Sequence, residues 1–470
     1  MRATWVAIGA ALSMGLALAA EAVPDAASTA ADREAVAVTI YNDDLALVKE
    51  RRRVDLPAGL SRLSLREVAA QLRPETALLR AASGQPITLV EQNFDFDVLT
   101  PQKLLEKYVG KEVTVIRSHP TTGEERRETA VVLSDHMGSV LRFPDRIETG
   151  VPGRLAFENV PATLRDRPTL SVLLETTGGS QSLELSYLTS GMTWKADYVA
   201  NLATDGQSLD LNGWVTLTNK SGAAFDDATL QLVAGTVNRA RAPAARAMQR
   251  TAVASAVAAA PLPTEEPLMD YHLYSFERPT SIAHNQTKQL ALLSASAVPV
   301  RREYLLAGSG SYYRGPYDGV ARKLKPAVYL EFDNAGESLG KPLPAGVVRV
   351  YAKDSRGAAQ FVGEDRIEHT AKNERARLRL GEAFDITGER KQTAFRRIAD
   401  DVSESTWRIE LRNAKDEALT VKVQETLPGD WEILQESQPH TKESARVASW
   451  NVAVPAGGSA VLTYTVRVKS

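Results

Sequence analysis

Histidines and closely spaced carboxylates are the residues of this chain whose types and spacing could do acid–base chemistry or hold a metal ion. No two histidines have the spacing of a metal-binding motif, and no HExxH sequence occurs. Folding could still bring two or three histidines together, because separation along the chain does not forbid contact. We predict no catalytic residue, no metal site and no cofactor. The six histidines are His119, His136, His272, His284, His369 and His440.

Asp95 and Asp97 form the carboxylate pair best suited to catalysis. Residues two apart in a strand share a face, so these two side chains would point the same way, with Phe94 and Phe96 opposite. A glycosidase needs two carboxyl groups about 5–9.5 Å apart across a cleft. We interpret the pair as structural or solvent-facing. A hydrolase with a carboxylate site stays as our second alternative function.

Aromatic side chains offer another kind of site, in which a flat ring stacks on a sugar or a partner. Trp194 lies in a strand-like segment, where packing in the core is the competing interpretation. The glycine-rich segment RREYLLAGSGSYYRGPY at residues 301–317 predicts exposed tyrosines on a flexible loop. The residues that we expect to contact a ligand or partner are Trp194, Tyr304, Tyr312, Tyr313 and Tyr317.

Composition excludes several classes of protein. The chain has 470 residues and no cysteine, which excludes disulfides, thiolate metal sites and thiol nucleophiles. Its 56 basic and 58 acidic side chains give a net charge of −2, so no overall field attracts nucleic acid. Hydrophobic residues make up 43% and charged residues 24%, which is typical of a globular chain. The length predicts about two to four domains.

The first residues have the layout of a secretory signal. Arg2 is followed by an apolar run at residues 6–18 and by small residues suited to cleavage. We predict a signal peptide over residues 1–22 and a mobile tail over 23–35. The mature chain is expected to be exported to a bacterial periplasm or exterior. No later segment is apolar and long enough for a transmembrane helix.

From residue 36 onward the dominant pattern is alternation of apolar and polar residues, which is typical of half-buried strands. Lys49, Arg51 and Arg53 are expected on an exposed strand face, and a helix is expected at residues 101–108. Asn219 and Asn413 each end a strand before a polar turn, which indicates one type of hairpin used twice. The pattern predicts an all-β, multi-domain fold of tandem antiparallel β-sandwiches.

The predicted domains follow the breaks in this alternation. Five short strands suggest a small SH3-like barrel, and the last seventy or so residues suggest an immunoglobulin-like module. An alanine-, arginine- and proline-rich segment is expected to be a surface insertion, with partner docking as the alternative. The domains are an N-terminal β unit at 36–108, the barrel at 109–160, a β-sandwich at 161–317 interrupted by the insertion at 239–267, a second sandwich at 318–400 and the immunoglobulin-like module at 401–470.

Six segments carry a resemblance to a known family. They are 187–198 (YLTSGMTWKADY), 213–219 (GWVTLTN), 228–235 (ATLQLVAG), 361–370 (FVGEDRIEHT), 380–385 (LGEAFD) and 429–433 (GDWEI). These segments resemble an uncharacterised bacterial exported family that shares the domain of unknown function found in mucoidy inhibitor A-like proteins. The resemblance spans nearly all of the mature chain. It implies an all-β, exported, non-enzymatic protein and offers no catalytic residues.

The leading hypothesis is therefore a non-enzymatic envelope scaffold or protein-interaction protein. The first alternative is a carbohydrate- or cell-wall-binding protein that uses the aromatic residues. Envelope proteins or cell-wall glycans are the expected partners, and nucleic acid is not expected. The coiled-coil segment of mucoidy inhibitor-like relatives does not occur in this sequence, so their regulatory role is not carried over. The oligomeric state stays open.

Overall fold

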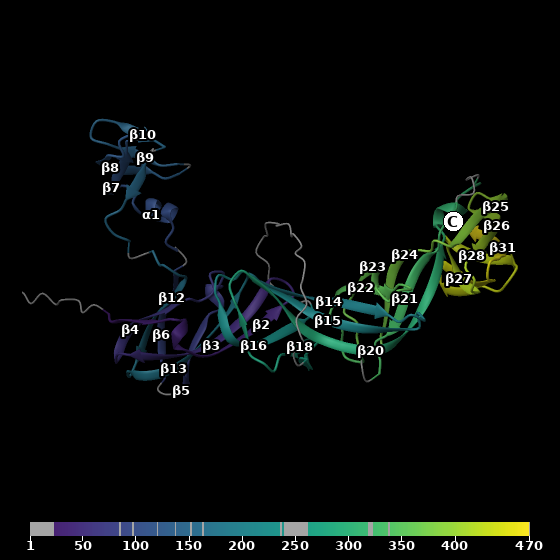
Figure 1. Ribbon diagram of the computed structural model, residues 1–470, viewed down its shortest axis with the longest axis horizontal. Coiled ribbons are helices and arrows are strands. Elements are labelled where there is room, and N and C mark those ends of the chain that lie inside the picture. Colours follow the sequence, from purple (N-terminus) through teal and green to yellow (C-terminus); the bar gives the residue numbers. More distant parts are fainter. Residues whose placement is uncertain are drawn as a thin grey trace, which may run out of the picture. The chain divides into compact units, whose positions relative to one another are not determined.

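Strands make up almost all of the regular structure of the chain (Figure 1). The computed structural model describes residues 23–83, 86–95, 98–119, 121–136, 138–150, 153–161, 164–235, 237–238, 262–317, 323–336 and 339–469. The predicted signal peptide lies outside them. The prediction of an all-β, multi-domain chain is confirmed, whereas the SH3-like and immunoglobulin-like descriptions stay predictions. In the described part, no helix has the length and apolar character needed to span a membrane.

The chain divides into two compact units. Unit 1 holds residues up to Val36, residues 48–189 and Ser221–Ala223, and unit 2 holds the rest. One sheet of unit 1 has the order β1-β4-β12-β6. Its strands are β1 (Asp25–Ser28), β4 (Gly59–Arg66), β12 (Thr169–Thr176) and β6 (Thr88–Asp95). A second sheet contains β3 (Leu45–Leu56), β13 (Gly179–Thr189) and β5 (Leu78–Ser83).

The start of the described chain differs from the predicted mobile tail at residues 23–35. Strand β1 pairs in parallel with β4, and the 3-10 helix η1 (Ala30–Asp32) follows it. Thr29 and Asp32 form a capping box, in which each side chain accepts a hydrogen bond from the other end of the turn. The small polar residues that suggested mobility are thus held by backbone pairing and capping. A second 3-10 helix, η2 (Pro74–Thr76), lies farther along unit 1.

A five-stranded sheet occupies the segment predicted to be a small barrel. Its order is β10-β9-β8-β7-β11, and helix α1 (Pro101–Lys107) precedes it. Thr100 caps this helix by accepting a hydrogen bond from the Lys103 backbone, so the helix is confirmed. Leu105 and Tyr108 pack with the apolar side chains of the sheet. The strands are β7 (Glu112–Ser118), β8 (Glu125–Ser134), β9 (Val140–Arg142), β10 (Ile147–Thr149) and β11 (Arg154–Ala156).

Unit 2 contains a sheet made from two parts of the chain that are distant in sequence. Strand β2 (Arg33–Tyr41), through residues 37–41, pairs in parallel with β16 (Phe225–Ala234). Antiparallel strands β18 (Tyr271–Ser275) and β17 (Thr264–Leu268) extend the sheet, and β19 (Thr280–Ile282) also pairs with β16. Residues 239–261 of the predicted insertion lie outside the described residues. Its last residues contribute most of β17.

The longest strand is β20 (Gln286–Ala307), a run of 22 residues. Its first part, up to Pro299, pairs with β15 (Ser208–Asn219), which in turn pairs with β14 (Met192–Leu202). From Val300 onward it pairs with β21 (Ala327–Asp333) and, over its last residues, with β27 (Leu419–Thr426). One strand therefore passes through two sheet regions without a loop (Figure 1).

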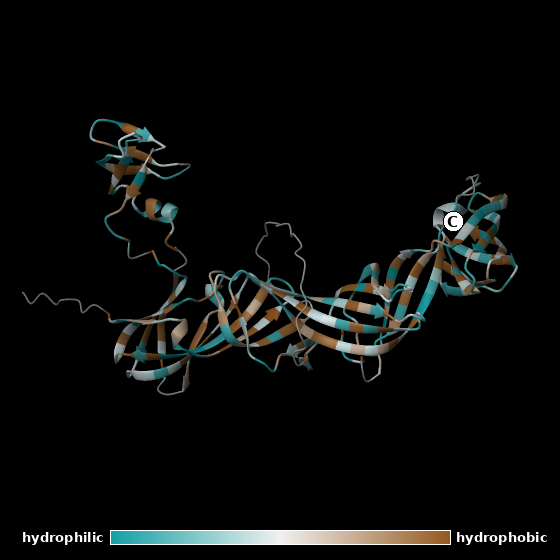
Figure 2. Ribbon diagram, viewed as in Figure 1, coloured by the Kyte–Doolittle hydropathy of each residue, from teal (hydrophilic) through white to brown (hydrophobic). Residues whose placement is uncertain are grey.

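The remaining strands of this large sheet lie beside β14, β21 and β27. Strand β22 pairs in parallel with β14 and antiparallel with β23, while β24 pairs with β21. Strand β30 joins β27 and β29. Hydrophobic and hydrophilic residues alternate along many of these strands (Figure 2), as the sequence pattern predicted. The strands are β22 (Gly346–Lys353), β23 (Ala359–Ile367), β24 (Arg375–Glu382), β29 (Thr441–Ser444) and β30 (Val447–Val454).

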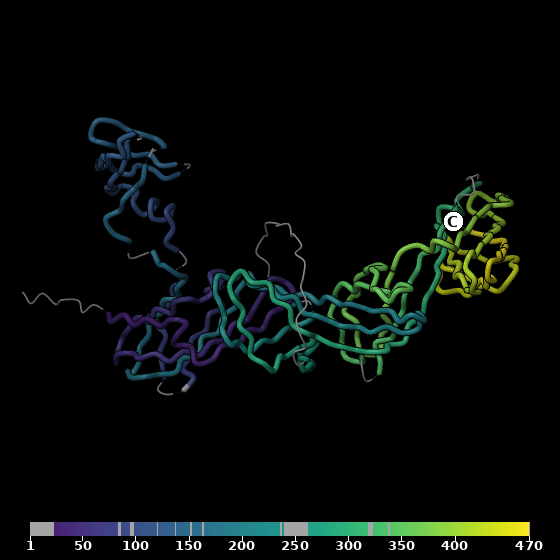
Figure 3. Tube along the Cα trace, in the orientation of Figure 1, coloured from purple at the N-terminus to yellow at the C-terminus, as the bar shows by residue number. Residues whose placement is uncertain are grey.

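A β-sandwich forms the C-terminal part of unit 2 (Figure 3). One sheet has the order β25-β26-β31-β28, and it shares a core with β27, β30 and the end of β20. This sandwich begins before the predicted boundary at residue 401, because β25 pairs along its length with β26. Alternation predicts a strand but does not say which sheet it joins. The four strands are β25 (Ile386–Ala399), β26 (Val402–Asn413), β28 (Asp430–Glu436) and β31 (Ser459–Lys469).

Buried asparagines close the turns of unit 2. The Asn413 side chain donates to the carbonyl oxygens of Glu417 and Pro455 at 2.8 and 3.0 Å and accepts from the Lys415 amide at 3.0 Å. Asn219 likewise donates to the carbonyls of residues 282 and 283. What the two predicted hairpins share is therefore the role of their asparagine. In each, an asparagine at a strand end binds the backbone of another segment. Asn334, just after β21, plays the same role.

Replacing Asn413 by alanine is expected to lower the free energy of unfolding by about 1–3 kcal/mol, because two carbonyls and an amide lose their buried partner. Asn451→Ala is the matched control, since Asn451 is exposed on β30, and its effect should stay within about 0.5 kcal/mol. Urea denaturation followed by tryptophan fluorescence measures both. Equal effects of the two substitutions would contradict this role of Asn413.

Candidate functional site

The tyrosine segment packs against the C-terminal sandwich. Tyr313 is buried in the 3-10 helix η3 (Gly310–Tyr313), Tyr312 is half-buried and Tyr317 is exposed. Their ring centres lie 5.4, 6.0 and 5.8 Å from that of the buried Trp407. The expectation of exposed tyrosines is thus wrong for Tyr313. A contact of Tyr317 or Tyr312 with a ligand or partner stays a prediction.

Tyr304 is also buried, near the end of β20. The Lys415 ammonium lies 5.5 Å from its ring centre and donates a hydrogen bond of 3.1 Å to its hydroxyl. Tyr304 shares the sandwich core with Tyr313 and Trp407. The structure therefore brings four of the five predicted residues to one sandwich, mostly as packing groups.

A buried polar network explains why this segment needs both tyrosine and glycine. Tyr313 donates a hydrogen bond of 2.9 Å to Glu425, and its hydroxyl lies 2.7 Å from that of Tyr464. Arg390 donates to the other carboxylate oxygen of Glu425 at 2.6 Å. A Cβ atom on Gly308 would clash with the Glu425 carboxylate, so a larger residue there would displace this carboxylate from Tyr313 and Arg390. Burial raises the pKa of Tyr313 and of Tyr464.

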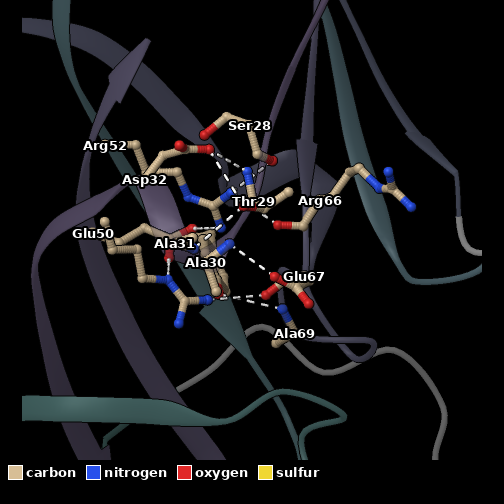
Figure 4. A network of polar contacts seen from close by, with 12 residues as sticks. Ser28, Thr29, Ala30, Ala31, Asp32, Glu50, Arg52, Arg66, Glu67 and Ala69 are labelled. Carbon is tan, nitrogen blue, oxygen red and sulfur yellow. Dashed lines mark hydrogen bonds and ion pairs between the residues drawn. The ribbon is translucent and has the colours of Figure 1, made fainter.

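A second buried network lies in unit 1 and holds the N-terminal segment (Figure 4). Glu50 is fully buried on β3 and accepts hydrogen bonds from Arg33 at 2.6 Å and from Arg52 at 2.9 Å. Arg52 also donates to the carbonyl oxygens of Ser28 and Arg66 at 3.1 and 2.8 Å. One guanidinium thus joins β1, β3 and β4. Such buried pairs specify geometry more than they add stability, because desolvation offsets the attraction.

The alternation of β3 could have revealed this network. Lys49, Arg51 and Arg53 are exposed, as predicted. The same alternation places Glu50 and Arg52 on the opposite face, with the buried Val48 and Val54. An acid and a base on a buried face two residues apart are a signal for an internal ion pair, which the sequence interpretation missed.

Trp194 lies on β14 and is 3% exposed, which excludes an open stacking platform. Its ring contacts Tyr274 edge-to-face, with the centres 6.4 Å apart. Tyr274 in turn lines a pocket of unit 2. Trp194 therefore lies behind that pocket and away from the tyrosines of the sandwich.

The pocket has a volume of about 250 Å³ and lies between two walls. The first wall is the β16–β18 pair, in which Ala234 is opposite His272. His272 and Tyr274 are two residues apart on β18, so their side chains share a face. The second wall consists of the segments around Leu343 and Thr370. Ala234, Tyr274, Leu343 and Thr370 are buried, whereas Asp270, His272 and His369 are more exposed and form the rim.

Backbone and side-chain hydrogen bonds hold the second wall in place. Leu343 and Thr370 exchange two backbone hydrogen bonds of 2.9 Å. Asn334 donates to the carbonyls of Lys341 and Ala371 at 2.8 and 2.9 Å. The Tyr274 hydroxyl donates to the Pro342 carbonyl at 3.0 Å, which links the two walls directly. The pocket is thus preformed by contacts within unit 2.

The hydrogen-bond partners define the protonation of the two rim histidines. Nδ1 of His272 lies 2.8 Å from a carboxylate oxygen of Glu265, so it carries a proton and donates. Nδ1 of His369 accepts a hydrogen bond of 3.2 Å from the Ala345 amide, so its proton lies on Nε2. Burial lowers the pKa of His369; Glu368 opposes this shift and the charge of His272 adds to it. His369 is therefore a neutral Nε2–H donor at pH 7.

These pocket residues were not singled out from the sequence. His272 and His369 are 97 positions apart, and they line one pocket because the Tyr274–Pro342 hydrogen bond joins β18 to the segment that pairs with Thr370. The alternation of His272 and Tyr274 in a predicted strand was the available signal. Asp97 and the side chain of Asp95 lie outside the described residues, so that pair stays a prediction. Within the described ranges, no three His, Asp or Glu side chains cluster as metal ligands.

Comparison with known proteins yields one family. The model of the family described as Domain of unknown function (DUF4139) matches residues 183–470. This range starts within β13 and contains both the pocket and the C-terminal sandwich. No curated protein matches the chain significantly.

Replacing Glu50 by alanine is expected to destabilise unit 1 by about 3–5 kcal/mol, because the buried Arg52 and the half-buried Arg33 lose their counter-charge. Hydrogen exchange measured on peptides of β3 and β4 would show the loss of protection. Lys49→Ala, one position away on the exposed face, is the control and should change stability by less than about 0.5 kcal/mol. Unchanged protection in Glu50→Ala would refute the role of this carboxylate.

Proposed function

Starting from the fact that this chain belongs to the DUF4139 family, we propose that it is an exported, non-enzymatic scaffold or protein-interaction protein of the bacterial cell envelope. A relationship to mucoidy inhibitor A-like proteins is part of this proposal and rests on the six resembling segments. Export to the periplasm or exterior rests on the leader-like residues 1–22. The partners would be envelope proteins.

The observation that carries the proposal is the continuity of β20. Most strands have 3–10 residues, whereas β20 has 22 and would span about 70 Å at the usual rise per residue. It pairs with β15 before Pro299 and with β21 after Val300. A strand with ladder hydrogen bonds on its sides cannot bend freely, because bending breaks those bonds. Unit 2 can therefore hold two sheet regions at a fixed separation, as a scaffold requires.

The exposed face beside β20 supports the same function. Arg377 on β24 forms ion pairs with Glu303 and Glu331, the latter at 3.0 Å, and its guanidinium lies 3.6 Å from the Tyr329 ring centre. Each exposed pair contributes little stability, about 0–1 kcal/mol. Together they fix the cross-strand geometry of a solvated face. Such a face stays in water and is available to a partner.

Proximity labelling in the native bacterium tests this function. The full chain with a labelling enzyme at its C-terminus should enrich a reproducible set of envelope proteins. A four-residue Gly-Ser insertion between Pro299 and Val300 should reduce enrichment of partners that contact both sheet regions by about tenfold, since the second contact loses its effective concentration. The insertion removes the fixed spacing while leaving both regions in the chain.

The same insertion between Asp400 and Asp401 is the control, because these residues form the exposed tip of the β25–β26 hairpin. It should leave the labelled set unchanged. If the unaltered chain enriches no envelope protein above background, the proposal fails. Labelling that is insensitive to both insertions would show that the rigidity of β20 has no part in partner binding.

A further inference from the structure

We propose that the pocket between β18 and the segments around Leu343 and Thr370 binds a neutral sugar unit of about monosaccharide size. This pocket does not include β20 or the face around Arg377, on which the proposed scaffold function rests. The two proposals can therefore be tested separately. The volume of about 250 Å³ lies just below the range of roughly 300–1,000 Å³ typical of drug-sized ligands. A ligand with a single ring therefore matches the available space.

The distribution of polarity in the pocket matches a sugar ring. The deeper lining is apolar or aromatic, with Ala234, Leu343 and the ring of Tyr274 all less than 5% exposed. The polar groups of Asp270, His272 and His369 lie at the rim. A hexose has a C–H face that can lie on the apolar floor and hydroxyl groups that can reach the rim. An amphipathic ligand of this kind fits better than a wholly apolar one.

The rim presents complementary hydrogen-bonding groups. Because Nδ1 of each histidine is engaged by Glu265 or Ala345, Nε2 is the ring nitrogen left to bind a ligand. Nε2 of His369, whose Nδ1 accepts from the Ala345 amide, donates. Asp270 adds a carboxylate that only accepts. A hydroxyl both donates and accepts, so a pair of hydroxyls on one ring can satisfy this set.

Charge argues against an anionic ligand. No lysine or arginine is among the residues that line the pocket, while Asp270 lies at the rim and Glu265 pairs with His272. A phosphate or carboxylate would meet the negative charge of Asp270, and no lysine or arginine in the lining balances it. A cationic amine would be attracted, but it could not accept a hydrogen bond from the Nε2–H group of His369. The neutral hydroxylated ring satisfies both conditions.

The walls of the pocket are held in place before any ligand binds, which favours ligand binding. The Tyr274–Pro342 hydrogen bond and the Asn334 contacts fix the pocket before a ligand arrives. A preformed site loses less entropy on binding than a flexible one. The edge-to-face contact of Trp194 with Tyr274 adds support behind the floor. Trp194, which sequence analysis associated with sugar stacking, would thus act indirectly, by holding Tyr274.

Saturation-transfer NMR on the full mature chain tests the assignment. The probes are methyl α-glucoside, N-acetylglucosamine and its trisaccharide, with glucuronate and tetramethylammonium as anionic and cationic comparisons. The neutral sugars should give signals, and the two comparison probes should not. If the trisaccharide binds more tightly than N-acetylglucosamine, the natural ligand is the end of a glycan chain. If the two bind equally, the natural ligand is a free sugar.

Two substitutions locate the binding. Ala371 lies exposed at the pocket rim, so Ala371→Phe should fill the pocket without disturbing the core and weaken sugar binding by about tenfold or more. Ala358→Phe places the same ring at an exposed turn away from the pocket and should have no effect. Asp270→Asn keeps the shape of the rim and should weaken binding less than Ala371→Phe. Thermal melting of each variant shows whether it is folded.

The proposal is overturned if the unaltered chain binds none of the neutral sugars. It is also overturned if Ala371→Phe binds them as well as Ala358→Phe does, because the sugar would then lie elsewhere. A stronger signal from tetramethylammonium or glucuronate than from the sugars would overturn the assigned ligand class. None of these results bears on partner labelling, so the failure of this site and the failure of the scaffold function can be told apart.

Discussion

Backbone hydrogen bonding along β20 is the constraint on which the second unit depends. Through this strand, the ladder that contains β14 and β15 continues into the one that contains β21 and β27. A positive φ at Ala297, whose amide donates to Asp210, and the missing amide of Pro299 allow the strand to change partners without a break. The C-terminal sandwich is built on strands of this ladder, and the second wall of the pocket adjoins its strands β22 and β23, whereas β16 and β18 belong to another sheet.

Buried polar groups connect segments in a chain that has no disulfides. Arg52 joins three strands of unit 1 through Glu50 and two carbonyls, and Glu425 joins Tyr313 and Arg390 in the sandwich. Asn219, Asn334 and Asn413 perform the same task with neutral amides. An unpaired buried polar group is costly, so each of these residues penalises any arrangement in which its partners are absent. They therefore specify one arrangement of the strands.

Sequence patterns predicted local structure better than they predicted sites. The period of two identified the strands and the exposed face of Lys49, Arg51 and Arg53. The asparagines at strand ends were recognised as a shared device, and the structure adds what they bind. The tyrosine segment was expected to be exposed, whereas Tyr304 and Tyr313 are buried. Glycine and tyrosine favour a loop locally. The tyrosine segment is nevertheless covered, because Trp407 and Glu425, which lie far away in the sequence, pack against it in the folded chain.

The sequence by itself determined the β class, the capped helix at Thr100 and the membership in a family that shares its C-terminal domain. These properties depend on residues close together in the chain, whose spacing sets periodicity and capping. Only the tertiary structure decided which strands share a sheet and that His272 and His369 line one pocket. Strand pairing joins residues far apart in sequence, such as Ala37 with Thr229, through backbone groups that every residue possesses. Because backbone groups are the same in every residue, they do not specify which strands pair. The packing of side chains in the whole unit determines the pairing.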